Sequence, residues 1–244
     1  MEFEIDLVRG TLAAVIVFLA YTVRGIAGFG SALIAVPLLA FMFPVQIVVP
    51  VVVFLDYIGS ASQGLQNRQL IAWREQLPLI PFTFVGVGVG LYLFSTLDPA
   101  SLAKALGGFV IIYAIYQLLP LPDLRGPRAM AAPCGFAGGL LGALFGTGGP
   151  FYVIYLGLRN LEKGAFRATF ALNFLIDGAI RLAAYATFGF FQPKIVLSML
   201  AALPIIALGL WLGGRVHADM SQRAYAKLIS VLLLGSGVTL LLKA

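Results

Sequence analysis

Charge is scarce in this chain of 244 residues. Only 11% of the residues are Asp, Glu, Lys or Arg, whereas 61% are hydrophobic, and the mean hydropathy is +1.00. Because an ordinary soluble domain carries about 25% charged residues, this chain has too little charge to coat a surface that faces water. The composition therefore predicts a protein of the lipid bilayer. In that setting the net charge of +6 indicates loops at an anionic membrane surface, not a nucleic-acid binder.

Residues that bind metals or form disulfides are also nearly absent. The chain has one cysteine, Cys134, and one histidine, His217. A disulfide within the chain is excluded, and a metal cage of His and Cys ligands is not expected. The sequence contains no Walker loop and no HExxH motif, and no nucleophile and base form an evident pair. We therefore expect neither an enzyme nor a resident cofactor.

Long apolar runs fill most of the chain. They predict ten helical segments, at residues 7–23, 31–43, 45–65, 77–97, 100–119, 131–145, 150–158, 165–189, 194–214 and 222–243. A helix needs about 20 residues to cross the hydrocarbon core, so the segments at 31–43 and 150–158 are expected to be half-helices. The acidic start of the chain, from Met1 to Asp6, is unlike the positive start of a cleavable signal peptide. The first run is therefore expected to remain as a membrane helix.

Two glycine-rich stretches interrupt the apolar runs at matching places in the two halves. Residues 25–30, the first break, read Gly-Ile-Ala-Gly-Phe-Gly, and residues 142–150, the second break, read Gly-Ala-Leu-Phe-Gly-Thr-Gly-Gly-Pro. Glycine and proline both disfavour a helix interior. Main chain that leaves a helix within the bilayer must be buried in protein or face a watery cavity. A pair of such interruptions is typical of the substrate site of a secondary transporter, and we expect the two breaks to meet there.

The two halves resemble each other in the order of their glycines and prolines. Four residues of the first half have counterparts 123 positions later: Pro81, Gly86, Gly90 and Lys104 match Pro204, Gly209, Gly213 and Lys227. Gly28 and Gly30 match Gly146 and Gly148 at the slightly smaller offset of 118. Several coincidences in the same order indicate an internal duplication. We predict a first membrane repeat over residues 1–119, a linker over 120–130 and a second repeat over 131–244.

Basic residues are distributed unequally between the two predicted sides of the membrane. Ten fall on one side: Arg68, Arg74, Arg125, Arg128, Arg159, Lys163, Arg167, Arg215, Arg223 and Lys227. Four fall on the other: Arg9, Lys104, Lys194 and Lys243. The positive-inside rule makes the richer side cytoplasmic, so both termini are predicted to lie outside the cytoplasm. Each half then crosses the membrane an odd number of times. The expected fold is thus an all-α, multi-pass protein of the inner membrane with two inverted repeats.

The residues of the two breaks also resemble a known family. Gly25 to Leu39, with its Gly-Ile-Ala-Gly-Phe-Gly start, looks like the first glycine-rich motif of the TauE/SafE family of anion permeases, and residues 141–150 resemble the second. The size, the central linker and the duplication extend this resemblance over essentially the whole chain. It implies the export or uptake of sulfite, of sulfonates such as sulfoacetate, or of related small sulfur-containing anions.

An anion site at the breaks would use the starts of the half-helices, where unpaired N–H groups and a partial positive charge favour oxyanions. Glycine lets the main chain approach the ligand, hydroxyls add donors, and an arginine adds a fixed charge. The candidate binding residues are therefore Arg24, Gly28, Gly30, Ser31, Gly146, Thr147, Gly148 and Gly149. The alternative role for these glycines is close helix packing. For Gly86, Gly90, Gly209 and Gly213 the four-residue spacing favours packing.

Three charged residues lie inside predicted membrane helices, namely Asp56, Asp177 and Arg181. A charge in hydrocarbon is expensive and must face a partner or a cavity. Asp177 and Arg181 are four residues apart and are expected to pair on one helical face. Either these residues form a charge relay, in which an aspartate takes a coupling proton while an arginine holds the anion, or they form a static salt bridge that fixes helix packing. Both interpretations remain open at this point.

We therefore predict a secondary carrier of small oxyanions that exports its substrate by alternating access. Its partners would be the anion, a coupling proton and the lipid bilayer, with no role for nucleic acid. The alternative is a membrane assembly or scaffold protein that transports nothing. The sequence leaves the identity of the anion, the direction of transport and the oligomeric state open.

Overall fold

The described part of the chain is helical throughout. The computed structural model describes residues 6–27, 30–64, 69–119, 125–215 and 222–243. The helices in order are α1 (Leu7–Ala27), α2 (Ser31–Leu39), α3 (Val45–Gly64), α4 (Trp73–Gln76), α5 (Leu79–Thr96), α6 (Pro99–Leu118), the 3-10 turn η2 (Arg128–Met130), α7 (Ala131–Phe145), α8 (Gly149–Leu158), α9 (Lys163–Thr187), α10 (Pro193–Arg215) and α11 (Gln222–Lys243). Five helical stretches among these residues are long and apolar enough to cross a membrane. The prediction of a multi-pass, all-α membrane protein is therefore confirmed.

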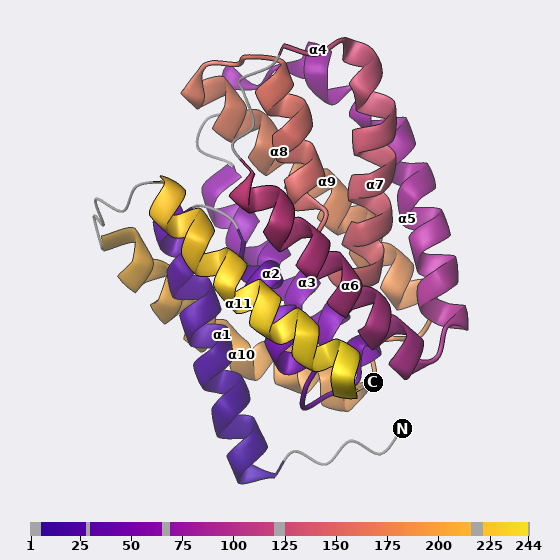
Figure 1. Ribbon diagram of the computed structural model, residues 1–244, viewed down its shortest axis with the longest axis vertical. Coiled ribbons are helices and arrows are strands. Elements are labelled where there is room, and N and C mark those ends of the chain that lie inside the picture. The colour runs from indigo at the N-terminus through magenta and orange to yellow at the C-terminus, as the bar shows by residue number, and fades with distance from the viewer. Residues whose placement is uncertain (1–5, 28–29, 65–68, 120–124, 216–221, 244) are drawn as a thin grey trace. The chain divides into compact units, whose positions relative to one another are not determined.

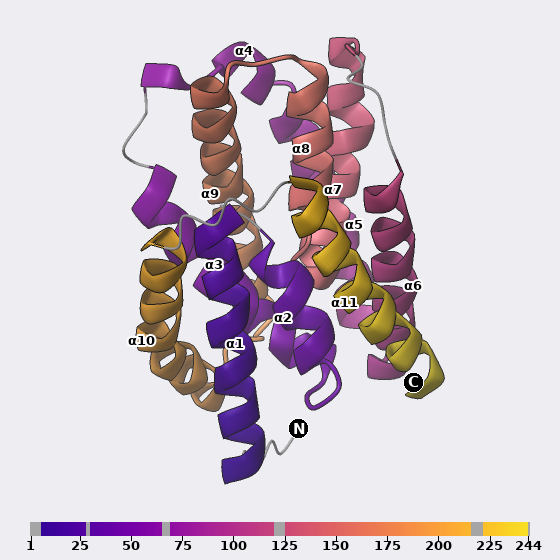
Figure 2. The same ribbon diagram turned by 60° about the vertical axis from the view of Figure 1, so that its left-hand side comes forward.

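The helices group into two compact units, and each unit draws helices from both halves of the sequence. The first unit consists of residues 1–51, 99–119 and 193–244, and the second of residues 52–98 and 120–192. In the first unit α1 packs against α10 and α2, and α6 packs against α11. Figure 2 shows α1 lying between α2 and α10. In the second unit α5 lies beside α7 along most of its length, as Figure 1 shows.

Glycines on α5 and α10 make equivalent contacts in the two units. A Cβ at Gly86 of α5 would strike the carbonyl oxygen of Phe136 on α7. A Cβ at Gly209 of α10 would come within 2.9 Å of the carbonyl oxygen of Phe18 on α1. The offsets are 123 between the two glycines and 118 between the two phenylalanines. These are the same two offsets that align the halves in the sequence.

The next turn of each helix pair repeats the pattern. A Cβ at Gly90 would lie 2.6 Å from the carbonyl oxygen of Leu140, and one at Gly213 would strike the carbonyl oxygen of Thr22. The prediction that these four glycines form packing faces is confirmed. The matching helices pair across the halves, because α5 of the first half packs on α7 of the second while α10 of the second half packs on α1 of the first. The inversion of the repeats, and their boundaries at residues 119 and 131, stay predictions.

The breaks are shorter than the glycine pattern predicts. Helix α1 continues through Gly25 to Ala27, and α7 continues through Gly142 to Phe145. In the second segment the chain leaves the helix only at residues 146–148. Glycine alone does not end a membrane helix when a tightly packed partner supports it, and Gly25 lies against Gly213 of α10.

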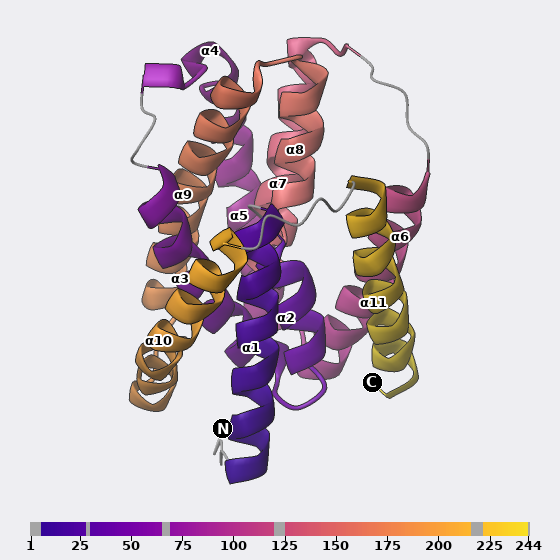
Figure 3. The same cartoon turned by 90° about the vertical axis from the view of Figure 1, so that its left-hand side faces the viewer.

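Helix α9 is the central element of the second unit. It is 25 residues long, which is enough to span a bilayer, and it packs against α4, α5, α7 and α8. Figure 3 shows α8 beside α9 and α4 at the end where α9 begins. A cluster of buried apolar side chains fills the space between α5, α7 and α8, including Cys134 as a small packing residue.

Candidate functional site

The second break is a tight reversal between α7 and α8. Gly146 follows the last turn of α7 with φ 71°, a left-handed conformation that glycine adopts without strain. Its N–H donates to the carbonyl oxygen of Gly142 over 2.9 Å. A Cβ at Gly148 would strike the carbonyl oxygen of Gly138 on α7. Helix α8 then begins at Gly149 with Pro150 in its first turn, a position where a missing N–H costs nothing.

An arginine from α9 lies against this reversal. Arg181 donates from Nη1 to the carbonyl oxygen of Gly142 over 2.9 Å, and its Nη2 lies 2.7 Å from Oδ2 of Asp177. Both side chains are almost completely buried. The predicted pairing of Asp177 with Arg181 is therefore confirmed. The pair holds the guanidinium beside the break, at a depth where an isolated charge would be very costly.

Several donors around the second break have no hydrogen-bond acceptor in the described part of the chain. They include Nε of Arg181 and the hydroxyl of Thr147, which are both buried. Among the described residues, no main-chain bond uses the N–H groups of Gly148 and Gly149, which are the first free donors of α8. Buried polar groups nearly always find a partner. A set made of donors, with a partial positive charge from the helix start, suits an acceptor-only ligand such as an oxyanion.

The first break brings two predicted residues together in the first unit. Nη1 of Arg24, near the end of α1, donates to the hydroxyl of Ser31, the first residue of α2, over 3.2 Å. Both residues are buried, and the guanidinium lies 5.9 Å from the ring centre of Tyr21. Gly30 precedes α2 with φ 99°. Gly28, also predicted at this site, lies outside the described residues.

Comparison with known proteins adds an independent observation. The family model described as "Sulfite exporter TauE/SafE" matches residues 13–240. The chain belongs to this family. It is therefore a transport protein of the membrane, and the expectation that it is not an enzyme agrees with a family of transporters.

Two curated relatives resemble the chain over most of its length. One is the "Probable inner membrane transporter protein TsaS" of Comamonas testosteroni, 28% identical over 194 residues, which cover 78% of this chain and 80% of the relative. Another is the "Probable sulfite/organosulfonate exporter TauE" of Cupriavidus necator, 27% identical over 229 residues, which cover 90% of this chain and 88% of the relative. No solved structure matches the chain.

Asp56, the third predicted intramembrane charge of this TauE/SafE protein, belongs to the part of α3 in the second unit. It is buried and lies close enough to Arg181 for their charges to interact. The next residue of α3 contacts α9, because the ring of Tyr57 lies against Gly178. The structure thus associates the two predicted aspartates with one arginine.

The sequence suggests Asn173 as a polar neighbour of Asp177, but sequence reasoning missed Tyr152, Thr83 and Gln76 beside it. The hydroxyl of Tyr152 on α8 has Thr83, Asn173 and Asp177 as close neighbours. Asn173 in turn accepts a hydrogen bond of 2.8 Å from Nε2 of Gln76. The signal in the sequence was weak, because a lone tyrosine or threonine in an apolar helix is commonplace. The four-residue spacing of polar residues along α9 was the available clue.

A second missed group lies at the end of the unit that carries α4. Glu75 is buried and accepts hydrogen bonds from Arg128, over 3.0 Å, and from Arg159 and Tyr155, each over 2.9 Å. Arg159 also donates to the carbonyl oxygen of Gly126. The carboxylate thus ties the segment before α7 to the end of α8. Two of the basic residues assigned to the richer side of the membrane therefore meet on one acid.

Proposed function

We propose that this protein carries small oxyanions, of the sulfite or organosulfonate class, out of the cytoplasm across the inner membrane. The family and the printed name of the Cupriavidus relative support this substrate class. The single observation that carries the proposal is a pair of buried donors beside the second break, Arg181 Nε and Thr147 Oγ1, which have no acceptor among the described residues. Glycines there would let the main chain approach the anion.

In this proposal Arg181 holds the anion and Asp177 takes up a coupling proton. An ionised carboxylate 2.7 Å from the guanidinium competes with an incoming anion for the same positive charge. Protonation of Asp177 removes that competition, so the anion and a proton bind together, and an outward concentration gradient of the anion drives the export of both. Arg24 and Ser31 would serve the anion at the other break. The movement between inward-facing and outward-facing states is alternating access between inverted repeats, with both termini outside the cytoplasm.

The flux assay that tests the proposal uses purified protein in liposomes and a radiolabelled sulfonate. A sulfonate is preferable to sulfite because it stays ionised across the pH range of the experiment. We expect saturable uptake, inhibited by unlabelled sulfite and not by an equal concentration of a neutral analogue. Absence of flux in folded, reconstituted protein would favour the non-transporting scaffold.

A conservative variant tests the site itself. Thr147→Val keeps the side-chain volume, removes an unpartnered hydroxyl and breaks no hydrogen bond of the described chain. We expect the KM for the sulfonate to rise by about tenfold, because a hydrogen bond to a charged group contributes about 1.5–3 kcal/mol. Thr96→Val is the matched control, since Thr96 is exposed and bonds only within its own helix turn. Equal KM values for both variants would remove Thr147 from the site.

The coupling step has its own test. Asp177→Asn is expected to make sulfonate uptake independent of an imposed pH gradient, because the asparagine neither binds nor releases a proton. The wild-type protein should respond to the gradient in the same liposomes. A variant that still follows the pH gradient would show that another group carries the proton.

A further inference from the structure

Polar residues form a continuous stripe along α9. They recur at every fourth position, so each lies about one turn beyond the last and the row winds slowly round the helix, and each is at most 2% exposed. The stripe consists of Thr169, Asn173, Asp177, Arg181 and Tyr185. At 1.5 Å per residue it extends for about 24 Å, most of the roughly 30 Å of a hydrocarbon core. Polar groups inside a membrane are costly and usually functional, and so this stripe requires a role.

The two ends of the stripe are satisfied by the protein. At the α4 end the main-chain N–H of Ala72 donates to the hydroxyl of Thr169 over 2.9 Å. At the other end the hydroxyl of Tyr185 donates to the carbonyl oxygen of Ala143 on α7. Both contacts fix α9 to its neighbours. The middle of the stripe behaves differently.

Around Asn173 and Asp177 five buried polar atoms have no hydrogen-bond partner among the described residues. We call these residues the Tyr152 cluster; the atoms are Gln76 Oε1, Thr83 Oγ1, Tyr152 Oη, Asn173 Nδ2 and Asp177 Oδ1. The Tyr152 hydroxyl lies near Thr83, Asn173 and Asp177 but does not have the geometry of a direct hydrogen bond to any of them, and Gln76 is bonded to Asn173. Each residue is at most 2% exposed. Such a concentration of unpaired groups is unstable unless small polar molecules complete it.

The kinds of atoms in the cluster indicate which molecule completes it. The amide nitrogen of Asn173 donates, whereas Gln76 Oε1 and the ionised Asp177 oxygen accept, and the two hydroxyls do both. An oxyanion only accepts, so it would meet two unpaired acceptors here. Water donates and accepts, and buried water typically bridges several groups of this kind. The donor-rich surroundings of Thr147 and Arg181 Nε therefore suit the anion, and the Tyr152 cluster suits water.

We propose that the Tyr152 cluster holds a short chain of water molecules that carries protons between the α4 end of the second unit and Asp177. A proton entering from the α4 end passes from water to water, each molecule accepting one proton and releasing another, and ends on the Asp177 carboxylate. The carboxylate becomes a neutral acid, and no other bond changes. This inference rests on the proposed function, because it supplies the proton that accompanies the anion.

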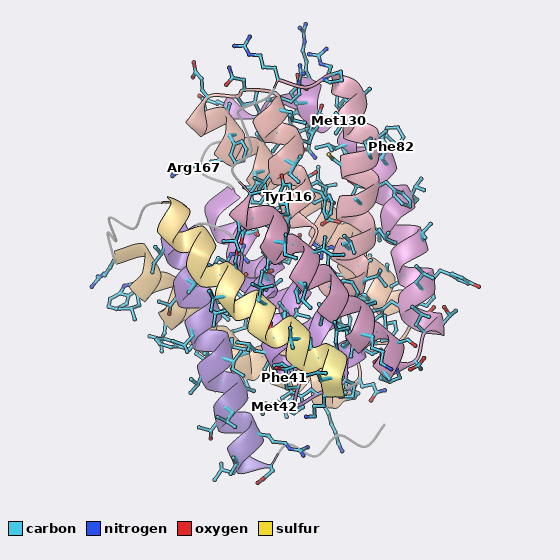
Figure 4. All side chains as sticks on the ribbon, viewed as in Figure 1. Phe41, Met42, Phe82, Tyr116, Met130 and Arg167 are labelled. Atoms are coloured by element: carbon cyan, nitrogen blue, oxygen red, sulfur yellow. The ribbon has the colours of Figure 1, made fainter. Side chains whose placement is uncertain are left out.

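Other titratable groups face Asp177 from several of the surrounding elements. Arg181 and Tyr185 lie on α9 itself and Tyr152 on α8, while Asp56 of α3 acts through Arg181. Among the described residues, α5 contributes Thr83 and α7 the carbonyl of Gly142. Arg167, labelled in Figure 4, lies nearer the start of α9 and is exposed. Among these groups Asp177 is the carboxylic acid that lies beside the Tyr152 cluster, and the proposed water chain therefore ends there.

Radiolytic footprinting in lipid nanodiscs tests the water directly. Hydroxyl radicals formed from bound water oxidise the side chains beside it, and Tyr152 and Tyr185 offer a matched pair, since both are 0% exposed. The Tyr185 hydroxyl donates to a main-chain carbonyl, whereas the Tyr152 hydroxyl makes no bond of hydrogen-bond geometry to the described residues. We expect oxidation of Tyr152 to be several times faster than that of Tyr185. Equal rates for the two tyrosines would overturn the inference.

Proton-driven transport tests the role of the water. Tyr152→Phe removes the hydroxyl and keeps the ring that packs on Gly138. We expect sulfonate uptake driven by a pH gradient to fall by about tenfold, the equivalent of one lost bridging hydrogen bond, while exchange of labelled for unlabelled sulfonate at equal pH is kept. Thr83→Val gives a second variant with the same expectation, and Tyr92→Phe, at an exposed position of α5, is the control.

The outcomes separate the two proposals. Wild-type protein without any sulfonate flux would contradict the proposed function. Wild-type flux together with normal proton-driven uptake in both Tyr152→Phe and Thr83→Val would contradict only the water chain. A parallel loss of exchange and of proton-driven uptake would assign the cluster to the anion, and it would also overturn this inference.

Discussion

Gly30 and Gly148 occupy equivalent places in the two halves, yet their φ angles are 99° and −69°. In the first segment, α1–α2, the chain takes a left-handed residue just before it enters α2. In the second, α7–α8, the left-handed residue is Gly146, immediately after α7. Two glycine-rich segments that match at an offset of 118 therefore form two different turns. The glycines supply the conformational freedom, and the packing of each segment decides where it is used.

The two segments also obtain their arginine from different helices. At the offset of 118 that pairs the breaks, Arg24 of α1 aligns in the sequence with Gly142 of α7. A Cβ at Gly142 would lie 3.5 Å from the guanidinium of Arg181, so an arginine of α9 fills the space beside that glycine. The glycine contacts match between the two segments, whereas the side chains at the two breaks differ. Arg24 contacts a hydroxyl, and Arg181 contacts a carboxylate and a carbonyl oxygen.

The largest expected effect comes from breaking the arginine contact of the second segment. Arg181→Gln leaves Asp177 buried without its cation, and we expect a loss of about 3–5 kcal/mol of stability together with loss of transport. Thermal unfolding in detergent, followed by size-exclusion chromatography, measures the loss of stability. The double variant Arg181→Gln with Asp177→Asn should recover much of the stability and none of the transport. An unchanged melting temperature in the single variant would contradict the buried pair.

Matched alanine substitutions examine what the two segments share. Gly86→Ala and Gly209→Ala each place a Cβ on the main chain of the partner helix, and we expect each to cost about 1–3 kcal/mol. Gly88→Ala and Gly214→Ala have nothing within 4 Å of the new atom and should stabilise by about 0.5–1 kcal/mol, because alanine favours a helix. A loss of stability in Gly86→Ala with a gain in Gly88→Ala, and likewise a loss in Gly209→Ala with a gain in Gly214→Ala, would support the repeated packing. Stability changes of the same sign within either of these two comparisons would refute it.

The different turns predict a smaller effect at the first break. Gly30→Ala forces a residue with a Cβ to adopt φ 99°, at a cost of about 1–2 kcal/mol. Gly30→Asn should cost less, since asparagine tolerates positive φ better than alanine does. At Gly148 the asparagine variant should be no better than alanine, because the obstacle there is the Gly138 carbonyl. Melting temperatures of the four variants decide the matter.

The smallest expected effect concerns Ser31, whose counterpart at the offset of 118 is Gly149. Ser31→Ala removes the acceptor of the 3.2 Å bond from Arg24, which should cost about 0.5–1.5 kcal/mol and raise the KM for the sulfonate modestly. Thr11→Ala, at an exposed position of α1, is the control for both measurements. An effect as large as that of Arg181→Gln would mean that the first break bears the main anion site.

Much of this arrangement was predictable from local patterns. The predicted segment at residues 131–145 coincides with α7, and the ends of α2, α8 and α9 differ from prediction by four residues or fewer. The spacing of Asp177 and Arg181 predicted their ion pair, since residues four apart share a helical face. The proximity of Arg24 to Ser31 followed from their position across one short break.

Contacts between distant segments were beyond such reasoning. Nothing in the sequence assigns Glu75 to Arg128, Arg159 and Tyr155, or places the hydroxyl of Tyr152 beside Asp177. The lengths of the breaks were also overestimated, because Gly25 and Gly142 lie within helices.

The sequence by itself determined the class of protein, the helical segments and the repeated glycine pattern, because hydropathy and glycine spacing are local properties that lipid enforces strongly. Tertiary structure alone decided which helices exchange partners between the halves, which arginine lies against each break, and which buried polar atoms of the described chain are without a partner. Those features depend on close packing between segments far apart in the chain. The energy of such packing is fixed by shape and hydrogen-bond geometry and not by composition.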